Sequence, residues 1–539
     1  MAMEPFTVSR RTLLAASGAA PLLLVHAPAV AAPPADTRRP ASPPITLPAV
    51  QRWGRGTVAK KLKLSGRILL APGALEFREE AELLAEDLLA GGHVSRLPDV
   101  VVSSSARPHD IVLRRGRVRG SGENPEAYEL TADQSVVITA PTATGLFWGT
   151  RTLLQLLRSG RPVEWVRDWP QLSERTLMVD IGRKYFSPDW LKQVIREMAY
   201  LKMNTLQLHV SEGVGFRVES LTHPEIVSDQ HLTQAEVREI LEHARRHHVH
   251  VNGDVDTPGH MDHILSSYPE MQLVLANGKR HGGFLDFSQP AARTLVHDIV
   301  GEMCDLFDGP VFHLGGDEYF PAPWQGNGPD VVSDATAPQL VAYARQVTGR
   351  SDATALDGYE FYLNELAELV RSKGKSARIF NDDVYPGEGV TTIDPATQVD
   401  VWIRWNRSKP DAGDYVDAGH QVINANGDYL YFILTSTGLG TGPYKNPKGI
   451  YERWTPRTFM GAAGSQGDYL LPPDKPILGA HLSVWCDSPD ALTQGEVADL
   501  LQEWLQTFAQ RTWGSPQLVD TLAELQARVL PVVGTAPTP

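Results

Sequence analysis

TLMVDIGRKYFSPDWLKQVIREMAYLKMNTLQLHV, residues 176–210, contains the pattern that decides the fold. The apolar runs Thr176–Ile181 and Thr205–Val210 are typical of buried strands. The stretch Pro188–Leu201 between them predicts a helix, because Ser187 followed by proline at the first helical position is a start signal. A strand, a helix and a second strand in this order form the repeating unit of parallel α/β folds.

The same alternation continues to the end of a long C-terminal region. Six further strands are expected at Val249–Val255, Val311–Gly315, Arg378–Asn381, Val399–Trp405, Gln421–Asn424 and Leu478–Trp485. Helical patterns lie between several of them, at Gln234–His247, Pro290–Phe307 and Gly358–Ser372. Eight strands with mostly helical crossovers over about 310 residues predict a (β/α)8 TIM barrel, an α/β fold.

A small α+β domain is expected before the barrel. Short apolar runs at 111–113, 128–130 and 136–138 indicate strands, while 74–89 and 144–157 have helical spacing. The expected organisation is an export signal at 1–31, a flexible proline-rich linker at 32–48, the small domain at 49–168, the catalytic barrel at 169–515 and a C-terminal helix and tail at 516–539.

The first 31 residues resemble a twin-arginine export signal. Arg10 and Arg11 precede an apolar run that ends at Val25, and residues 29–31 offer a small-residue cleavage site. The apolar run is too short to span a bilayer comfortably. We therefore expect a secreted protein without a membrane anchor after removal of the signal. The formal net charge of −14 argues against a nucleic-acid partner, because phosphate contacts need Lys and Arg.

Polar and aromatic side chains follow the expected strands at the end where TIM barrels place their active sites. In chain order they are Arg183, Glu212, Asp256, His260, Asp317, Glu318, Asp382, Trp402, Tyr429, Tyr431, Trp485 and Asp487. Convergence from eight separate segments is hard to explain as core packing. We therefore predict the active site at this end of the barrel.

Paired carboxylates with tryptophans are typical of a sugar pocket. Trp faces pack on pyranose rings, while Asp and Arg bond the hydroxyls. Glycoside hydrolysis needs an acid for the leaving oxygen and a group that stabilises the oxocarbenium-like centre, and Asp317 and Glu318 are the expected pair. Adjacent carboxylates in a shielded cleft raise each other's proton affinity. Since strand neighbours point to opposite faces, the two are expected to reach different parts of one sugar.

The run His313-Leu314-Gly315-Gly316-Asp317-Glu318 resembles the His-x-Gly-Gly-Asp-Glu signature of glycoside hydrolase family 20, the β-N-acetylhexosaminidases. Further resemblances follow in the family's order, at Asp180-Ile181-Gly182-Arg183, Asp256-Thr257-Pro258-Gly259-His260, Tyr429-Leu430 and Trp485-Cys486-Asp487. The resemblance covers residues 60–515. It implies retaining, substrate-assisted hydrolysis, in which the 2-acetamido oxygen attacks the anomeric carbon to form an oxazolinium.

The resemblance also implies roles for single residues. Glu318 would act as general acid and then base, Asp317 would orient the acetamide, and Tyr429 would bond its oxygen. The other substrate-binding residues would be Arg183, Trp402, Trp485, Asp487 and Asp382, with His260, Glu212, Asp256 and His313 behind them. The expected partner is an oligosaccharide or glycan, and no cofactor or metal is implied.

Four positions depart from the family pattern. Glu212 stands where Asp is expected, Phe380 where Trp is expected, Tyr431 where Asp often follows Tyr-Leu, and Asp487 where Glu is expected. They leave the sugar (GlcNAc or GalNAc), the linkage and the product open. Lacto-N-biosidases of the same family, which release Gal-β-1,3-GlcNAc, are therefore an alternative, because Asp487 is one methylene shorter than Glu and Phe380 replaces a larger ring.

Two hypotheses from other functional classes also stay open. A catalytically silent carbohydrate-binding protein is expected to have lost Glu318 or Asp317, and both are present. A metal-dependent hydrolase is the other, because histidines and aspartates crowd residues 247–263. However, His247 and His248 are expected at the opposite end of the barrel from Asp256 and His260. Activity that survives chelation would exclude a metal.

Overall fold

The structure is a computed structural model that describes residues 43–54, 64–160, 163–322, 325–326, 328–440, 442–462 and 467–538. The expected export signal and residues 32–42 of the expected linker lie outside these ranges, so both stay predictions. Within the described part of the chain, no helix is both long and apolar enough to cross a bilayer.

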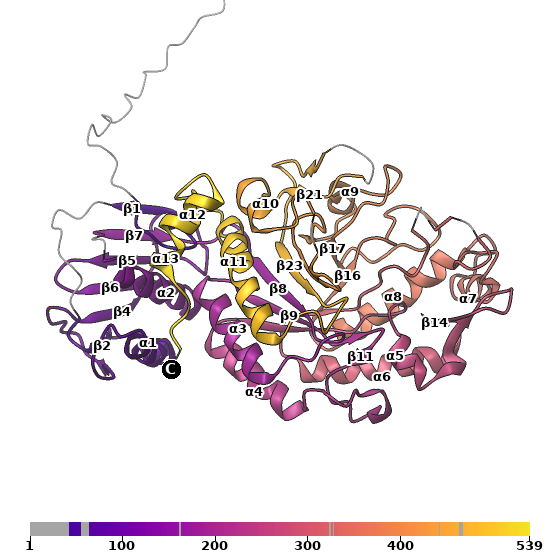
Figure 1. Cartoon of the computed structure of the whole chain (residues 1–539), viewed down its shortest axis with the longest axis horizontal. Helices are drawn as coiled ribbons and strands as arrows, with labels where there is room; N and C mark the ends of the chain where they lie inside the picture. Colours follow the sequence, from indigo (N-terminus) through magenta and orange to yellow (C-terminus); the bar gives the residue numbers. More distant parts are fainter. Residues whose placement is uncertain are drawn as a thin grey trace, which may run out of the picture. The chain divides into compact units, whose positions relative to one another are not determined.

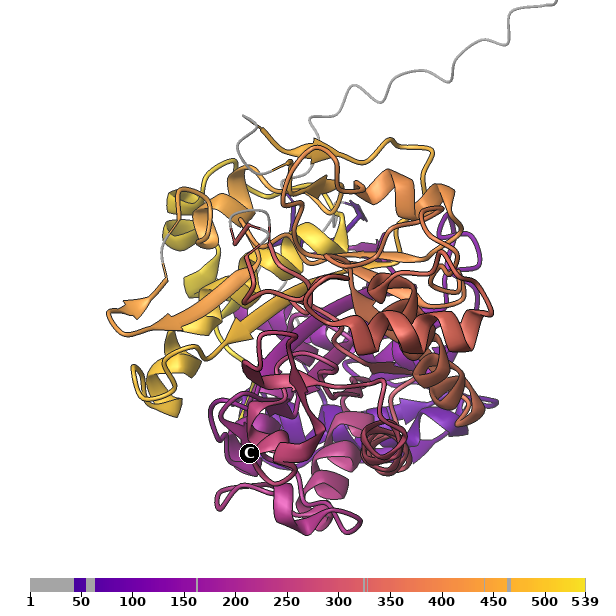
Figure 2. The ribbon, with the colours of Figure 1, turned by 90° about the vertical axis from the view of Figure 1, so that its right-hand side faces the viewer.

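A closed barrel of eight parallel strands forms the larger part of the described chain (Figure 1). The strands are β8 (Glu174–Asp180), β9 (Thr205–His209), β12 (His250–Asp254), β15 (Val311–His313), β16 (Ser376–Phe380), β17 (Gln398–Val401), β18 (Val422–Asn424) and β23 (Gly479–Trp485). The ring closes because β23 pairs with both β18 and β8. In Figure 2 the magenta first half lies opposite the orange-to-yellow second half. The predicted (β/α)8 barrel is confirmed.

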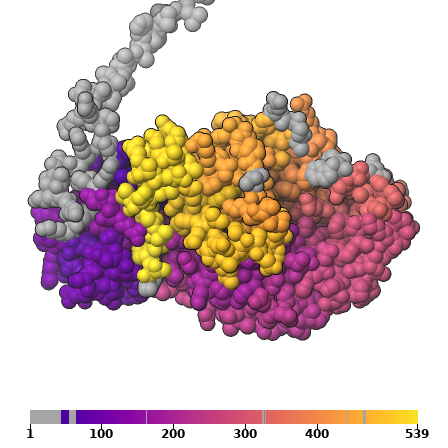
Figure 3. All heavy atoms as spheres, in the orientation of Figure 1, coloured from indigo at the N-terminus to yellow at the C-terminus, as the bar shows by residue number. Residues whose placement is uncertain are grey.

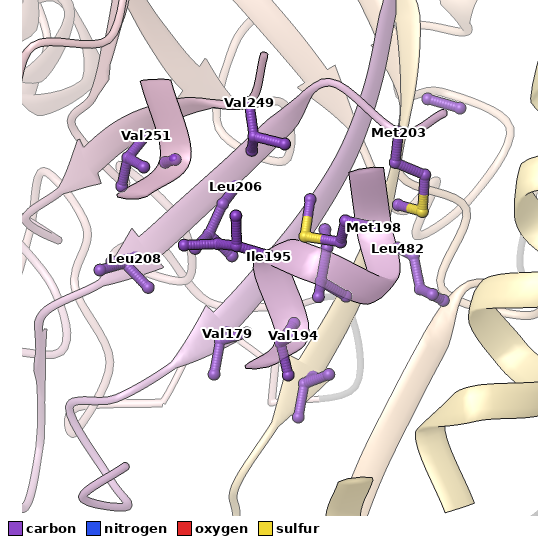
Figure 4. Packing of buried hydrophobic residues seen from close by; sticks show 14 of the residues in the cluster. Val179, Val194, Ile195, Met198, Met203, Leu206, Leu208, Val249, Val251 and Leu482 are labelled. Carbon is purple, nitrogen blue, oxygen red and sulfur yellow. The ribbon is translucent and has the colours of Figure 1, made fainter. Parts of the chain in front are cut away.

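Helices follow most of the strands and cover the outside of the barrel. They are α3 (Pro188–Tyr200), α4 (Gln234–Arg246), α6 (Pro290–Leu306), α7 (Pro338–Thr348), α8 (Ala355–Ser372), α9 (Ala412–Asp417) and α11 (Gln494–Trp513). The expected start of α3 is confirmed, since the Ser187 side chain accepts the Trp190 N–H. Helix α3 buries Val194, Ile195 and Met198, whose spacing forms one apolar stripe. Figure 4 shows these side chains beside Leu206 and Leu208.

Short elements decorate the loops of the barrel. They are β10 (Ser211–Glu212), β11 (Gly215–Phe216), α5 (Asp262–Ser266), β13 (Gln272–Val274), β14 (Arg280–Leu285), β19 (Tyr431–Thr435), β20 (Gly438–Leu439), α10 (Pro447–Glu452), β21 (Thr458–Phe459) and β22 (Tyr469–Leu470), with single 3-10 turns at Pro224–Ile226 and Pro269–Met271. Strand β19 also pairs in parallel with the end of β23, which brings Tyr431 level with Ser483.

The preceding domain is a mixed seven-stranded sheet with helices packed on it, so the expected α+β unit is present. Its order is β1-β7-β5-β6-β4-β2-β3. The elements are β1 (Arg52–Gly54), β2 (Arg67–Leu70), a 3-10 turn (Leu75–Phe77), α1 (Arg78–Ala90), β3 (Asp99–Val102), β4 (Ile111–Arg115), β5 (Tyr128–Ala132), β6 (Val136–Ala140), α2 (Ala143–Ser159) and β7 (Trp165–Asp168).

The part of the expected linker that the structure describes, residues 43–48, is not flexible. Leu47 is fully buried, and its amide donates to the Gln155 side chain at 2.7 Å while its carbonyl accepts from the same side chain at 2.9 Å. The next buried amide, that of Ala49, donates to Gln510 of α11. Buried backbone groups need such partners. The prediction of a flexible linker, which rested on proline-rich composition, is therefore wrong for residues 43–48, because Gln155 of the small domain anchors them.

The C-terminal residues form two short helices, α12 (Leu522–Arg528) and α13 (Leu530–Val533), at the junction of the two domains. The Val533 carbonyl accepts from Arg158 of α2 and from the Tyr200 hydroxyl of α3. Figure 3 shows this yellow segment between the purple and magenta regions. The expected C-terminal helix and tail is thus packed against both domains.

His247 lies at the contact between the small domain and the barrel, at the N-terminal end of β12. It is 4 % exposed, packs edge-on against Phe147 of α2 and stacks on His243 of α4 at 4.3 Å. Burial, with the neighbouring His243, lowers the pKa of His247 to about 3. The folded protein therefore holds this imidazole neutral at a pH where the unfolded chain protonates it.

We expect the stability contributed by His247 to be lost as the pH falls below 6.5, because the unfolded chain then binds an extra proton. Between pH 7 and pH 5 the loss is about 2 kcal/mol. Other histidines have raised pKa values and add stability as the pH falls, so the pH dependence of wild type alone does not isolate His247. The measurement therefore compares melting temperatures of wild type and His247→Phe across this range. The variant should lose less stability on acidification. The exposed His250→Gln serves as control, and identical pH slopes for wild type and His247→Phe would contradict the prediction.

Candidate active site

Asp317 and Glu318 lie in the loop after β15, at the C-terminal end of the barrel strands. The strand ends at His313, and Gly315, Gly316 and Glu318 all have positive φ values, of 66°, 88° and 54°. The prediction that the carboxylates diverge because they alternate along a strand is therefore wrong. The chain turns here instead: the Asp317 side chain is 12 % exposed and the Glu318 side chain 49 %, yet both carboxylates lie within 3.7 Å of one nitrogen, His260 Nε2.

Gly315 is required for the close approach of this loop to the loop after β12. A Cβ atom at this position would lie 1.7 Å from Asp256 Oδ1. The backbone conformation, with φ at 66°, also favours glycine. The two glycines therefore allow the chain to turn here and allow the buried Asp256 carboxylate to pack against it, besides leaving space for a ligand.

His260 connects the carboxylates to the neighbouring loops. Its Nε2 lies 3.5 Å from Glu318 Oε2 and 3.7 Å from Asp317 Oδ2, while its Nδ1 donates to Glu212 Oε2 at 3.2 Å. Although burial disfavours the imidazolium, the charges of Glu212 and Asp317 raise the pKa of His260 well above its usual value. The expected supporting residue is thus a cation that contacts both carboxylates directly.

Asp256 and Asp317 form a buried acid pair beside this imidazolium. Burial, together with the charge of Asp317, holds the pKa of Asp256 well above its usual range. Burial also raises the pKa of Asp317, against the charge of His260, and Glu318 raises it further. Asp317 Oδ1 is buried and accepts no hydrogen bond from an N–H or hydroxyl group of the residues that the structure describes, while the Asp256 carboxyl, whose pKa is raised, is a hydrogen-bond partner of Asp317. A carboxylate can accept several hydrogen bonds, so Asp317 can also accept from a ligand donor.

Arg183 is held at the mouth of the site by three carboxylates. Its guanidinium contacts Glu212 at 2.6 Å and Asp180 at 2.9 Å, and Asp487 lies 3.8 Å away. The Asp487 side chain is 54 % exposed. The first two contacts fix the orientation of Arg183, and Asp487 is left accessible from the mouth.

Aromatic rings form one wall and the floor of the candidate active site. Tyr431 stacks on Trp402, with ring centroids 5.9 Å apart and an angle of 11°, and meets Trp485 edge-on at 5.8 Å. Phe380 packs behind Trp485 at 6.3 Å. Burial and the charge of Asp317 raise the pKa of Tyr431, so its hydroxyl lies in the field of that carboxylate. These rings and the two carboxylates can enclose one sugar.

The structure does not bring Tyr429 to Asp317, contrary to the expected role. Tyr429 is fully buried, donates its hydroxyl to Asp468 and stacks on Tyr444 at 5.3 Å. Tyr431, two residues along, is instead the tyrosine whose hydroxyl lies in the field of Asp317. The sequence marks Tyr431 only as a departure, because a residue pattern does not show which of two alternate tyrosines the following strand turns inward.

Asp382 is also placed differently from its expected role as a substrate contact. It is 3 % exposed, and both carboxylate oxygens already accept hydrogen bonds, from the Glu318 amide and from the Trp402 indole. Asp383 and Lys409 lie beside it and were missed. The Asn-Asp-Asp run after the fifth strand was the available signal for Asp383.

A layer of buried ion pairs lies inside the barrel beneath the site. It comprises His209 with Asp254 at 2.7 Å, His481 with Asp400 at 2.8 Å, and Arg378 with Glu174 at 2.7 Å. His313 lies 3.5 Å from Asp254 and 3.4 Å from Asp400. Although burial opposes it, the charge of Asp254 raises the pKa of His313 to about 9. His313 therefore belongs to this layer of buried ion pairs and lies between Asp254 and Asp400.

Two side-chain groups here could in principle hold a metal: His209 with Glu212 and Asp256, and Asp256 with His260 and Asp317. Their chemistry fits a cation poorly. Glu212 is already paired with Arg183, and both histidines have raised pKa values, so they are protonated rather than free to coordinate. The crowded histidines His247 and His248 lie at the other end of β12, where His248 contacts Glu80 of α1.

A cavity of about 650 Å³ lies at the opposite, N-terminal end of the barrel strands, beside Leu172 and Ile477. Its lining includes Gln510 and Arg511 but no carboxylate. It is therefore separate from the carboxylate site, which occupies the end that TIM-barrel enzymes use.

Comparison with known proteins agrees with this geometry. Residues 173–515 match the profile described as "Glycosyl hydrolase family 20, catalytic domain", and residues 43–169 match "Glycosyl hydrolase family 20, domain 2". The chain is 26 % identical over 495 residues to a lacto-N-biosidase of Bifidobacterium bifidum, which covers 90 % of this chain but 41 % of that protein. The chain therefore spans about two fifths of that relative's length.

A β-N-acetylhexosaminidase of Cellulomonas fimi is 24 % identical over 486 residues, covering 84 % of this chain and 87 % of that one. The fold is similar to that of an exo-β-N-acetylglucosaminidase from Vibrio harveyi, solved with N-acetylglucosamine, with a TM-score of 0.70 and 18 % identity. This likeness covers 92 % of this chain and 78 % of that one. With the catalytic-domain profile matched over the whole barrel, the chain belongs to glycoside hydrolase family 20.

Proposed function

We propose that this protein is a retaining exo-glycosidase that removes terminal β-linked N-acetylhexosamine from glycans by substrate-assisted catalysis. The observation that carries the proposal is the buried Oδ1 of Asp317, which accepts from no N–H or hydroxyl group of the described residues and lies near Tyr431 and beside the more exposed Glu318. An acetamide group offers an N–H donor for Asp317 and an oxygen acceptor for the Tyr431 hydroxyl.

In the first step Glu318 donates its proton to the glycosidic oxygen as the bond from that oxygen to the anomeric carbon breaks. The acetamide oxygen forms a bond to the anomeric carbon and gives the oxazolinium. Asp317 accepts the acetamide N–H and stabilises its growing positive charge, while Tyr431 positions the acetamide oxygen. In the second step the Glu318 carboxylate takes a proton from water, and the water oxygen bonds to the anomeric carbon as the bond from that carbon to the acetamide oxygen breaks, which restores the acetamide and gives net retention.

His260 stabilises this cycle electrostatically. Its imidazolium lies within 3.7 Å of both carboxylates, so it favours the charged form of Asp317 during the reaction and of Glu318 after proton transfer. Glu212 holds the ring from the opposite nitrogen, and Arg183 holds Glu212. The rings of Trp402 and Trp485 bound the space for the sugar.

A second candidate, release of a disaccharide, is favoured by the geometry at Asp487. Its carboxylate is half exposed and 3.8 Å from Arg183, which leaves the outer side of the pocket less closed than a longer glutamate would. The similarity to a lacto-N-biosidase over 90 % of the chain supports the same reading. We favour the single sugar, because Arg183 is fixed in place to bond its outer hydroxyls.

Product analysis tests the choice. We expect release of GlcNAc from an aryl β-GlcNAc to be faster than release of the disaccharide from an aryl lacto-N-bioside, because a second sugar must displace groups around Arg183. One hydrogen bond to a substrate hydroxyl, gained or lost in such a site, changes the ratio of kcat/KM for two competing substrates by orders of magnitude. Chromatography of both reactions checks this. If only the intact disaccharide appears and aryl GlcNAc is untouched, the disaccharide reading replaces the single-sugar one.

A further inference from the structure

The backbone of Glu318 adopts a conformation that its own residue type disfavours. Its φ of 54° lies in the left-handed region, where a side chain crowds the following carbonyl. The neighbouring loop from β12 shows the same feature at His260, with φ at 55°. Such a conformation persists only where surrounding contacts enforce it. The contacts that enforce it at Glu318 therefore decide where its carboxylate lies.

Two successive carboxylates from the loop after β16 provide these contacts. The Glu318 amide donates to Asp382 Oδ2 at 2.8 Å, and the Phe320 amide donates to Asp383 Oδ2 at 3.0 Å. Both carboxylates are 3 % exposed. Tyr359 of α8 adds a hydrogen bond from its hydroxyl to the Gly316 carbonyl. Three buried hydrogen bonds to one short loop restrict its backbone, so they can hold the strained turn.

Lys409, from the loop after β17, is the cation beside these two acids, and its charge favours the ionised form of Asp383, whereas burial and the charge of Asp383 raise the pKa of Asp382 well above its usual range. Its ammonium donates to the Asp382 carbonyl at 3.1 Å and lies 3.9 Å from Asp383 Oδ1. In the part of the chain that the structure describes, no other basic side chain lies within 4 Å of either carboxylate. Burial raises the pKa of Asp383 to about 6, and Lys409 opposes that rise.

Asp382 also binds the aromatic wall. Its second oxygen, Oδ1, accepts the indole N–H of Trp402 at 3.0 Å. One carboxylate thus joins the backbone of Glu318 to the ring that bounds the sugar space. A change at Asp382 should therefore alter the distance between acid and sugar, even though Asp382 has no free oxygen for the substrate.

We propose that Asp382, Asp383 and Lys409 form a clamp of positioning residues that sets the place of Glu318 relative to Trp402. The proposal rests on the proposed function, since that assigns the acid role to Glu318. A misplacement of about 1 Å in a catalytic group can cost on the order of 10²-fold in rate. The cost should fall on the step that needs the acid, which is departure of a poor leaving group.

The test compares two substrates for each variant: a β-GlcNAc disaccharide, which needs protonation to leave, and dinitrophenyl β-GlcNAc, which does not. The quantity of interest is the ratio of their kcat/KM values, because a loss of folded enzyme lowers both equally. We expect Asp382→Asn to lower this ratio roughly tenfold or more. The asparagine side chain has one oxygen and one NH2 group, so it cannot accept from both the Glu318 amide and the Trp402 indole as Asp382 does.

Lys409→Met should shift the same ratio in the same direction, and Lys409→Arg should restore most of it by returning the charge. Glu388→Gln is the matched control, because Glu388 is an exposed carboxylate on the same loop. It should leave the ratio unchanged. Parallel loss of both rates in Asp382→Asn and Lys409→Met, with the ratio intact, would overturn the clamp.

Amide hydrogen exchange of the peptide containing residues 314–322 provides a readout that does not depend on turnover. We expect Asp382→Asn and Asp383→Asn to exchange faster there than wild type, with Glu388→Gln unchanged, because the bonds to the Glu318 and Phe320 amides are weakened. Unchanged protection in both variants would overturn the proposal. If wild type cleaves no N-acetylhexosaminide, the proposed function fails, while the exchange result still decides the clamp.

Discussion

Replacing Glu318 with glutamine is expected to leave a folded protein that hydrolyses unactivated β-N-acetylhexosaminides at least ~10²-fold more slowly, as loss of a general acid predicts. The side chain is half exposed, and its Oε2 lies 3.5 Å from His260 Nε2, so glutamine fits without leaving a buried charge unpaired. The effect should appear in kcat for oligosaccharides and shrink for aryl glycosides whose leaving groups need no proton.

Steady-state kinetics on the two substrate classes, with melting temperatures of both proteins, check this expectation. His250→Gln, which changes an exposed side chain at the other end of the barrel strands, should leave both rates near wild type. Near wild-type turnover of Glu318→Gln on an oligosaccharide would remove Glu318 as the acid. An equal loss on every leaving group would instead point to a role in binding.

The barrel was predictable because each strand is marked locally. Runs such as Thr176–Ile181 and Thr205–Val210 carry an unbroken apolar face and are buried along their whole length, as strands enclosed in a barrel must be, and proline or a capping side chain marks where helices start. The placement of functional residues at strand ends followed from that topology. The profile match over residues 173–515 agrees with the resemblance recognised in the signature around Asp317.

The contacts that tune the site were less predictable, because they depend on which loops meet. The expected fourth strand ran to Gly315, although two glycines in a row favour a turn, and the structure ends β15 at His313. Likewise, the inward side chain after β18 is Tyr431, since β19 pairs with β23 in that register. The local sequence around Tyr429 and Tyr431 does not show which of them faces inward, because pairing with the distant strand β23 sets that register.

The buried polar groups gave the weakest sequence signal. Asp400 and His481 sit inside apolar runs and look like isolated exceptions, yet they pair across the barrel at 2.8 Å. Residues 43–48 have the composition of a linker, but Gln155 satisfies their backbone. In both cases the stabilising partner is about 80 or more positions away in the chain, so only the folded arrangement explains the residue.

A substrate that carries a 2-hydroxyl in place of the 2-acetamido group is expected to be cleaved at least ~10³-fold more slowly than the matching aryl β-GlcNAc. In the proposed mechanism the acetamide oxygen is the nucleophile, and a well-oriented intramolecular nucleophile contributes an effective molarity of about 10⁵–10⁸ M. Without it, neither Asp317 nor Tyr431 has a group to orient. Rates for aryl β-glucoside and aryl β-GlcNAc with one common leaving group measure the difference.

Asp317→Asn sharpens this prediction, because its effect should depend on the same acetamide. The buried Oδ1, which accepts from no N–H or hydroxyl group of the described residues, is the proposed acceptor for the acetamide N–H, so we expect roughly 10²–10³-fold loss on aryl β-GlcNAc and little further loss on the slow glucoside. A cyclic analogue of the oxazolinium should likewise bind wild type far more tightly than GlcNAc does, and Asp317→Asn should lose most of that difference. Efficient cleavage of the glucoside by wild type, or an equal loss on both substrates in Asp317→Asn, would mean that the nucleophile comes from the protein or from water and not from the substrate.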